Sequence, residues 1–410
     1  MRSQDFDWPV SQSRFEYTRV SDEEFDRRHR IVREFMRNKG LDALIVMGAA
    51  AIQDRAWTNV RWLTNHAGCQ LSNAEYVVVP VEEDEPLTLA TVWMYEEVPA
   101  RRARAEDVVD DIRSTGIRAI EPVVERLKEL SVEGGTIGVV PVDGDLGIHA
   151  NDRDRLREEF PGTELRYVTR EFWELRMVKS DEEIKMIEKS AAIGDRVMES
   201  IRENVEPGMT ESEIFGIAAE TMSRHGGELP TMILVASTNT YDSDDSKQRM
   251  RPVNRSLQEG DTIIQEYTPR YPDGTESQIS RPVFLAEPAE EYKEMIELML
   301  EVYDDLMDAI RAGNTAQDLI KAVEPIKDAG YEHGAPVAHA SVGGGVSARP
   351  LIRPNSDDAD LVLEENMVLI PEPAIRTPDH TKGVFICDTV AVTDGKPNRL
   401  NDYPIEPIYL

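Results

Sequence analysis

The stretch GDTIIQEYTPRYPDGTESQISRPVF, residues 260–284, alternates apolar and polar residues on both sides of a Pro-Asp-Gly sequence at 272–274. A period of two that is interrupted by such a turn predicts two antiparallel strands joined in a hairpin. The polar positions of this hairpin are Gln265, Glu266, Glu276, Gln278 and Ser280. Residues two apart on a strand share a face, so Glu276, Gln278 and Ser280 are expected to point together. A hairpin that gathers so many carboxylates and amides is a candidate functional site.

The composition is that of an acidic globular chain. It has 410 residues, of which 40% are hydrophobic, and a formal net charge of −32. A field of this sign repels phosphate groups and anionic lipids, so we expect neither nucleic acid nor a membrane as a partner. Such an acidic surface is also typical of salt-adapted proteins.

The sequence favours a cytoplasmic location. No apolar run reaches the roughly 18 residues that a membrane helix needs, and the N-terminal stretch MRSQDFDWPVSQSRFEY is too polar and acidic for a signal peptide. The two cysteines, Cys69 and Cys387, cannot form a disulfide framework, which fits a reducing compartment. We therefore expect a cytoplasmic protein.

The first part of the chain has the pattern of an α/β domain. Helical patterns at 22–40 and 95–114 alternate with apolar strand patterns at 41–48 and 136–142. Strands separated by helices predict a sheet with helices on its faces. We assign this smaller α/β domain to residues 1–175.

The second part of the chain has an α+β pattern. Ser180 and Glu183 form a predicted capping box, which begins a long helix. From about residue 230, strands are followed by two helical patterns at 290–313 and 315–330 and then by further strands. We assign this domain to residues 176–410.

Four motifs in the second part carry a resemblance to a known family. They are LRMVKSDEEIKMI at 175–187, MRPVNRSLQEGDTII at 250–264, LEENMVLIPEPAI at 363–375 and ICDTVAVT at 386–393. In this order and spacing the chain resembles the creatinase, aminopeptidase P and prolidase family. The resemblance implies a C-terminal pita-bread domain, a creatinase-type α/β N-terminal domain, and a homodimer in which one N-terminal domain reaches over the active site of its partner.

The same resemblance assigns five positions to metal ligands in the metallopeptidases of the family. In this chain those positions hold Glu266, Gln278, His339, Glu372 and Cys387. A neutral amide and a thiol do not suit a dinuclear site for hard divalent ions, which prefer carboxylate oxygens. The chain is therefore more similar to the metal-free, creatinase-like branch, and we expect no cofactor. A single divalent ion held by Glu266, His339 and Glu372 is the alternative.

The match to creatinase itself is incomplete. The position of its catalytic histidine falls on Arg249, in RMRP at 249–252, and the position of its N-domain arginine falls on Asn73. Besides the catalytic candidates His339, Glu266 and Glu372, we therefore expect a wider set of substrate-binding residues. That set is Glu276, Gln278, Ser280, Arg249, Arg349, Trp62 and His66.

Several carboxylates in one cavity need a compensating charge. A cationic substrate can supply it, and His339 can then act as the acid or base because its ordinary pKa lies near neutrality. In the competing interpretation, Arg249, Arg281 or Arg349 neutralises Glu266 and Glu276 in an inert ion network. His333 and His380 are interpreted as surface or loop residues.

Three functions follow from these alternatives. The first is a metal-independent hydrolase, or a lyase, that cleaves a C–N bond in a small cationic or zwitterionic metabolite, by analogy with creatinase and ectoine hydrolase. The second is a metal-dependent hydrolase resembling the Xaa-Pro dipeptidases, with a reduced metal site. The third is a non-catalytic binding protein on the pita-bread fold.

Overall fold

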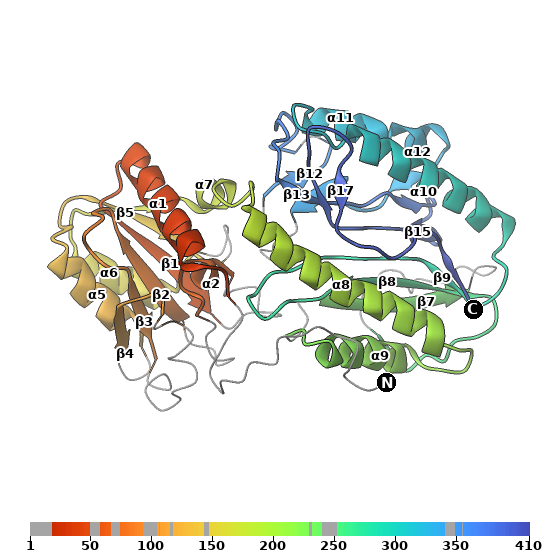
Figure 1. The fold of residues 1–410 in the computed structure, drawn as a ribbon, viewed down its shortest axis with the longest axis horizontal. Helices are drawn as coiled ribbons and strands as arrows, with labels where there is room; N and C mark the ends of the chain where they lie inside the picture. The colour runs from red at the N-terminus through yellow and green to blue at the C-terminus, as the bar shows by residue number, and fades with distance from the viewer. Residues whose placement is uncertain are drawn as a thin grey trace.

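The structure is a computed structural model. It describes residues 19–49, 58–66, 74–92, 105, 107–114, 118–142, 147–228, 232–239, 252–340, 349–354 and 356–410. Figure 1 shows two units side by side along the long axis of the molecule. We call the elements from α1 to α7 the N-terminal unit and those from α8 to β18 the C-terminal unit.

The N-terminal unit is built on a mixed sheet with the strand order β4-β3-β2-β1-β5-β6. Strand β1 pairs antiparallel with β2 and parallel with β5. The strands are β1 (Ala43–Ala49), β2 (Ala74–Pro80), β3 (Thr88–Thr91), β4 (Asp111–Ser114), β5 (Thr136–Val140) and β6 (Glu164–Tyr167). The helices are α1 (Asp22–Lys39), α2 (Thr58–Thr64), α5 (Ile120–Glu129), α6 (Ala150–Glu159) and α7 (Thr169–Glu174).

Both faces of this sheet are covered by helices. Leu44 and Val46 of β1 pack in one apolar core with residues of α1, α2 and α7. The alternate residues Ile45 and Met47 pack in a second core with residues of α5 and α6. A strand buried on both faces must be apolar at nearly every position, which is why 43–47 reads as a continuous hydrophobic run.

Helix α1 begins and ends at the residues that the sequence indicates. Ser21 Oγ accepts a hydrogen bond from the Glu24 backbone amide at the N-terminus. Gly40 ends the helix in the left-handed conformation with φ 64°, which glycine adopts without a steric penalty.

The helix expected over 95–114 is wrong at its C-terminal end. Residues Asp111–Ser114 form β4, which pairs in parallel with β3 at the edge of the sheet. The periodic charges of this segment satisfy a helical pattern, but pairing with β3 overrides that local preference. Residues 95–104, where this expected helix begins, lie outside the described residues.

The C-terminal unit holds three sheets. Their strand orders are β18-β9-β8-β7, β12-β11-β13-β16-β17 and β10-β14-β15. The strands up to β11 are β7 (Met232–Asn239), β8 (Asp261–Thr268), β9 (Val283–Phe284), β10 (Glu332–His333) and β11 (Ala338–Ala340). The remaining strands are β12 (Leu351–Ile352), β13 (Val368–Pro371), β14 (Ala374–Arg376), β15 (Gly383–Phe385), β16 (Val390–Ala391), β17 (Asn398–Arg399) and β18 (Ile408–Tyr409).

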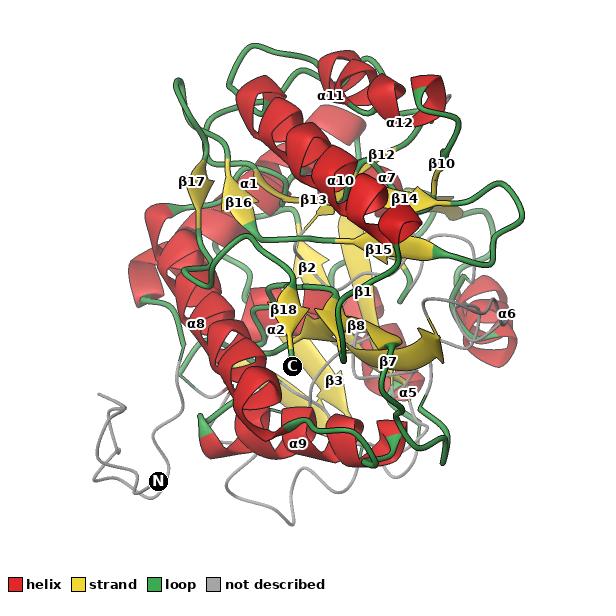
Figure 2. Ribbon diagram, turned by 90° about the vertical axis from the view of Figure 1, so that its right-hand side faces the viewer, coloured by secondary structure: helices red, strands yellow, loops and turns green. Residues whose placement is uncertain are grey.

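Helices α8 (Asp181–Asn204) and α9 (Glu211–Arg224) cover the sheet that contains β7 and β8. Each begins with a capping box, formed by Ser180 with Glu183 and by Thr210 with Glu213. Their apolar faces pack on residues such as Ile233 of β7. Figure 2 shows both helices on the same side of this sheet.

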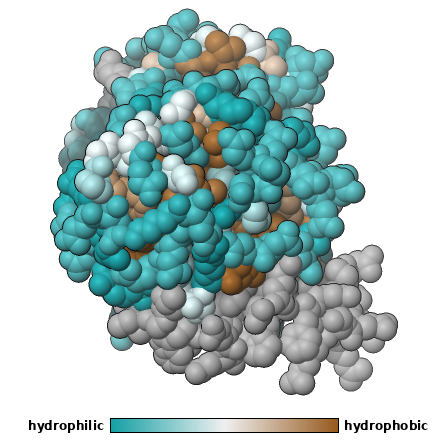
Figure 3. Space-filling model, turned by 90° about the vertical axis from the view of Figure 1, so that its left-hand side faces the viewer, coloured by the Kyte–Doolittle hydropathy of each residue, from teal (hydrophilic) through white to brown (hydrophobic). Residues whose placement is uncertain are grey.

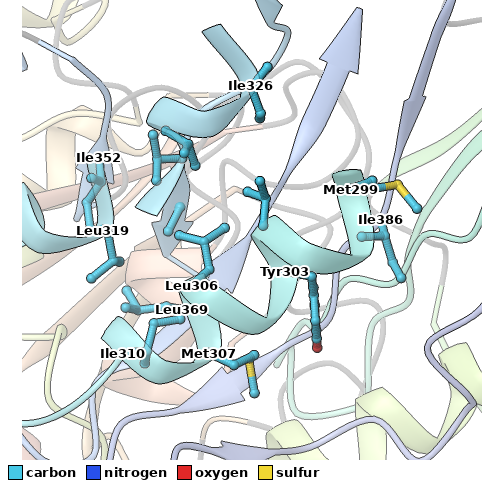
Figure 4. Packing of buried hydrophobic residues seen from close by; sticks show 14 of the residues in the cluster. Met299, Tyr303, Leu306, Met307, Ile310, Leu319, Ile326, Ile352, Leu369 and Ile386 are labelled. Carbon is cyan, nitrogen blue, oxygen red and sulfur yellow. The ribbon is translucent and has the colours of Figure 1, made fainter. Parts of the chain in front are cut away.

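A second helical layer is formed by α10 (Glu290–Ala309), α11 (Ala316–Ala322) and α12 (Glu324–Asp328). The expected helix over 315–330 is divided at Val323, and Pro325 lies in the first turn of α12, where a proline is tolerated. These helices bury a large apolar cluster against the strands around Leu369, shown in Figure 4. The strand sheets and their helical covers together confirm the predicted α+β fold class.

The hairpin at 260–284 is present, but its return strand is irregular. Strand β8 pairs with β7 along its whole length. On its other side, single bridges join Tyr267 to Ile279 and Arg270 to Glu276, and only Val283–Phe284 forms a regular strand. The return segment lies between two neighbours, because Ile279 bonds to Tyr267 on one edge and Ser280 bonds to Cys387 on the other.

The N-terminal unit contacts the C-terminal unit through Glu183, in the first turn of α8. Its carboxylate accepts hydrogen bonds from Trp62 Nε1 at 2.8 Å and from Arg28 Nη2 at 3.2 Å. Burial by itself raises the pKa of Glu183, but Arg28, Lys179 and the hydrogen bonds outweigh it and lower the pKa to about 2. Glu183 thus joins α1, α2 and α8 as a buried anion.

We expect Glu183→Gln to lower the free energy of unfolding by roughly 3 kcal/mol at pH 7. This energy corresponds to the difference between the ordinary pKa of 4.5 and the pKa of about 2 in the folded chain. A carboxyl group with a depressed pKa stabilises the fold above its unfolded pKa. The wild-type advantage should therefore be lost as the pH falls from 4.5 towards 2. Urea unfolding at several pH values measures it. Asp181→Asn, at an exposed position in the same helical turn, is the control and should cost less than about 1 kcal/mol. Equal losses in the two variants would contradict the role of Glu183.

Among the described residues, no helix is long and apolar enough to cross a membrane.

The face at the end of the N-terminal unit is largely hydrophilic, with small separate hydrophobic areas (Figure 3). The boundary between residues 175 and 176 falls between α7 and α8, and it stays a prediction.

Candidate active site

Three residues from distant parts of the chain meet at one carboxylate oxygen. Gln278 Nε2 donates a hydrogen bond to Glu372 Oε1 at 2.5 Å, and His339 Nε2 lies 3.3 Å from the same oxygen. Gln278 comes from the return segment of the hairpin, His339 from β11, and Glu372 from the turn between β13 and β14. The structure thus brings together three of the residues predicted from the sequence.

The surroundings of His339 favour its doubly protonated form. Nδ1 lies 2.8 Å from the carbonyl oxygen of Ala340, and Nε2 faces Glu372, so both ring nitrogens face acceptors. Burial by itself lowers the pKa of His339, but the Glu372 carboxylate, with a further contribution from Glu266, raises it above the usual 6.5. The side chain is 24% exposed, so it can reach solvent or a ligand.

Glu266 belongs to the same electrostatic environment. It lies on β8 opposite Leu234 of β7, and its side chain is partly exposed. Its charge contributes to the raised pKa of both His339 and Cys387. Glu266 and Glu372 together therefore make this region of the C-terminal unit anionic.

Cys387 is fully buried beside Gln278. Its Sγ lies 3.6 Å from Gln278 Nε2, and its backbone pairs with that of Ser280. Burial, followed by the charges of Glu372 and Glu266, raises the pKa of the thiol well above its ordinary value. The side chain is a neutral thiol at physiological pH, in agreement with its interpretation as a buried small residue.

The donors at the five positions do not fit a dinuclear divalent metal site. Gln278 presents an amide N–H to Glu372 and so occupies a carboxylate oxygen that a metal ion would need. Cys387 presents a neutral thiol where a hard ion requires an oxygen ligand. Within the described ranges, no group of three or more His, Cys, Asp and Glu residues has the arrangement of a metal site. The single-ion set of Glu266, His339 and Glu372 stays a prediction.

Glu276 does not take part in this group. Its carboxylate forms a buried ion pair with Arg270, whose Nε lies 3.0 Å from Glu276 Oε1, and their side chains are 1% and 4% exposed. The expectation that Glu276 points with Gln278 into a binding site is therefore corrected. An arginine does neutralise Glu276: it is Arg270, its cross-strand neighbour, which the sequence interpretation did not name.

Ser280 and the remaining arginines have structural partners. Ser280 Oγ donates to the carbonyl oxygen of Gln265 at 2.6 Å. Arg281 is fully buried and pairs with Asp388 at 2.8 Å. Arg349 pairs with Asp358 at 2.9 Å. Arg249 lies outside the described residues, so its predicted substrate-binding role is not described by the structure.

Trp62 and His66 are both buried within this chain. Trp62 is 6% exposed and donates to Glu183. His66 is 1% exposed, and its Nε2 lies 2.6 Å from Glu75 Oε2. In these positions neither side chain offers a surface to the active site of a partner subunit. Trp62 of α2 thus helps to join the two units of one chain, and the substrate-binding role of Trp62 and His66 stays a prediction.

His333 is a neighbour of the site that the sequence interpretation placed on the surface. It is partly buried on β10, and its Nε2 lies 3.0 Å from the backbone carbonyl oxygen of Glu372. Burial lowers its pKa despite this hydrogen bond. The pairing of His333 with Ile375 across β10 and β14 brings it there, and no local pattern signals that pairing. His380 lies at the surface beside Glu332, as expected.

Comparisons with protein families match both units. Residues 185–394 match the family model described as metallopeptidase family M24, and residues 28–178 match the creatinase/prolidase N-terminal domain. These ranges fall on the C-terminal and N-terminal units respectively.

Curated relatives include peptidases and a creatinase. The Xaa-Pro dipeptidase of Pyrococcus furiosus is 30% identical over 229 residues, which cover 55% of this chain and 64% of that protein. The match thus spans less than two thirds of the length of that dipeptidase. The creatinase of Bacillus sp. is 25% identical over 410 aligned positions, which cover 94% of this chain and 92% of that protein.

Solved structures share the fold along nearly the whole chain. A recombinant prolidase from Thermococcus sibiricus superimposes with a TM-score of 0.79 at 23% identity, covering 96% of this chain and 100% of that one. The X-Pro aminopeptidase from Thermotoga maritima gives a TM-score of 0.75 at 21% identity, covering 93% and 99%.

Proposed function

Because the chain belongs to metallopeptidase family M24, with the creatinase/prolidase N-terminal domain in front, we propose that it hydrolyses a C–N bond in a small cationic or zwitterionic molecule without a metal ion. The sequence predictions of the family and of its pita-bread fold are confirmed by these matches, whereas the hydrolytic activity is part of the proposal. The substrate class and the independence from metal are the proposal.

The observation that carries the proposal is the convergence of Gln278 and His339 on Glu372. An amide donor fills the space beside the carboxylate, and the imidazole lies on the same oxygen. A carboxylate that holds an imidazolium in place is a common arrangement for general acid–base catalysis. It needs no Lewis acid to supply a proton.

The charge of the site supports a cationic substrate. Glu266 and Glu372 bring two negative charges, and a protonated His339 brings one positive charge. These carboxylates would attract an amidinium, guanidinium or quaternary ammonium group, while an anionic substrate would be repelled.

The proposed reaction uses His339 as the proton donor. Water adds to the carbon atom, the C–N bond breaks with its electron pair on nitrogen, and the imidazolium of His339 supplies the proton that this nitrogen takes up. Glu266 or Glu372 accepts the proton that the water loses. If the carboxylate removes a proton from a substrate carbon instead, the same residues perform an elimination, which is the lyase alternative.

The second candidate is a metal-dependent dipeptidase resembling the relatives named for Xaa-Pro substrates. The names of those relatives favour it. In that case Glu266, His339 and Glu372 are the residues that would hold a single ion. The substituted positions Gln278 and Cys387 argue against it.

A binding screen tests the substrate class. Ligands that bind only the folded chain raise its melting temperature. We expect guanidines, cyclic amidines or betaines to raise it in metal-free buffer and to be hydrolysed in a follow-up assay. If prolyl dipeptides raise it only when Mn²⁺, Co²⁺ or Zn²⁺ is added, the second candidate is favoured.

We keep the homodimer implied by the resemblance as part of the proposal. Since Trp62 and His66 are buried within their own chain, other residues would have to form a contact with the site of the partner. Light scattering on the purified chain measures the assembly.

A further inference from the structure

Helix α2 contacts the tip of the hairpin that carries Glu266 and Gln278. Arg61 of α2 forms two hydrogen bonds to the carboxylate of Glu228, Nη1 to Oε2 at 2.6 Å and Nη2 to Oε1 at 2.9 Å. Nη2 also donates to the carbonyl oxygen of Pro272, at the hairpin tip. The Arg61 side chain is 5% exposed and that of Glu228 is 26% exposed, so the guanidinium is buried while the carboxylate reaches solvent.

The turn of the hairpin is shaped to receive Arg61. Gly274 has a φ of 91°, a conformation that glycine adopts readily. A Cβ atom at this position would lie 2.6 Å from Arg61 Cδ and 2.9 Å from its Nε. The aliphatic stem of Arg61 therefore lies directly against the backbone of the turn.

Two further contacts connect this tip with the site. The backbone amide of Glu228 donates to the carbonyl oxygen of Arg270 at 2.9 Å. Arg270 then pairs with Glu276 across the hairpin, two residues before Gln278. A series of contacts thus runs from Arg61 to Glu276, and the chain continues through Ser277 to Gln278, which hydrogen-bonds Glu372.

We propose that Arg61 is a positioning residue, which fixes the hairpin tip against the N-terminal unit and thereby sets Gln278 and Glu266 relative to His339 and Glu372. The inference rests on the proposed function only in taking these four residues as the site. Since a displacement of about 1 Å can lower turnover roughly 100-fold, loss of the contact should act mainly on kcat.

The test compares Arg61→Ala and Arg61→Lys with Arg37→Ala. Arg37 also lies in the N-terminal unit but pairs with Glu83 at the exposed surface, so it is a matched control. We expect Arg61→Ala to lower kcat by at least about tenfold with a smaller change in KM. Arg61→Lys keeps the charge but not the paired hydrogen bonds, so it should restore kcat only in part. Arg37→Ala should behave as wild type.

A measurement without substrate separates this inference from the proposed function. NMR titration of labelled histidines reports the pKa of His339, assigned with the His339→Gln variant. We expect Arg61→Ala to lower that pKa, because Glu266 on the hairpin is then held less closely to the imidazole. If no cationic molecule is hydrolysed, the proposed function fails. The NMR titration of His339 still decides the role of Arg61 in that case, because it needs no substrate.

The inference is overturned if Arg61→Ala leaves both kcat and the pKa of His339 as in wild type, or if Arg37→Ala changes them equally. If Arg61→Ala does not fold, Glu228→Gln is used instead, since it keeps one acceptor oxygen for Arg61. It should then give the same changes in a smaller degree, and unchanged values would overturn the inference.

Discussion

His339→Ala should lower turnover by roughly 10²–10⁴-fold, the range that a general acid contributes. Of the two described side chains at the Glu372 carboxylate, the variant removes the one that can give up a proton near neutral pH, since Gln278 is a neutral amide. Steady-state kinetics on the substrate found by the binding screen measures the loss. Because the donor is the imidazolium, wild-type turnover should also decline as the pH rises above the raised pKa of His339.

Two variants control for structure. His339→Gln keeps a side chain that can donate to Glu372 but cannot transfer a proton, and it should be as impaired as His339→Ala. His380→Ala removes an exposed imidazole that pairs with Glu332 and should have no effect. Wild-type turnover in both His339 variants would refute the catalytic assignment and favour the non-catalytic binding protein.

Glu372→Gln should lower turnover by roughly 10²–10³-fold and also lower the pKa of His339. Burial has the largest influence on the pKa of His339 and lowers it. The carboxylate of Glu372 has the second largest influence and raises this pKa. Without its charge, burial opposes the imidazolium, so less of the acid form is present at neutral pH. Histidine NMR titration and kinetics on the same sample measure both effects.

The stability of this variant should change with pH in a defined direction. A histidine with a raised pKa stabilises the fold fully below its unfolded pKa of 6.5, and this contribution is lost as the pH rises through the folded pKa. Glu372→Gln should therefore lose most stability below pH 6.5. Glu332→Gln, beside the exposed His380, is the control for the titration. An unchanged pKa of His339 in Glu372→Gln would contradict the geometry of the site.

The elements of the fold follow largely from local patterns in the sequence. The capping box of Ser180 and Glu183 and the glycine that ends α1 each reflect an interaction within a few residues, and the apolar run of β1 is itself visible in the sequence. Strand β4 could not be predicted from local patterns, because its conformation depends on pairing with β3 and not on its own residues. The role of Glu183 between the units was also hidden, since it arises from packing of α1 and α2 on α8.

The candidate site, too, could be predicted only in part from the sequence. The resemblance indicated Gln278, His339 and Glu372, and the structure places them at one carboxylate oxygen. The partner of Glu276 was missed, although Arg270 and Glu276 lie three residues on either side of Asp273 and so could have been recognised as cross-strand neighbours. His333 had no such signal, because it reaches Glu372 through a pairing between strands far apart in the chain.

The central claim is that this member of a metallopeptidase family works without a metal ion. Elemental analysis of the chain purified without added metal, together with turnover in the presence of a chelator, tests it most directly. The proposed site predicts far less than one equivalent of Mn, Fe, Co or Zn per chain and no loss of turnover with the chelator. One or two equivalents of metal, with turnover abolished by the chelator and restored by the ion, would contradict it.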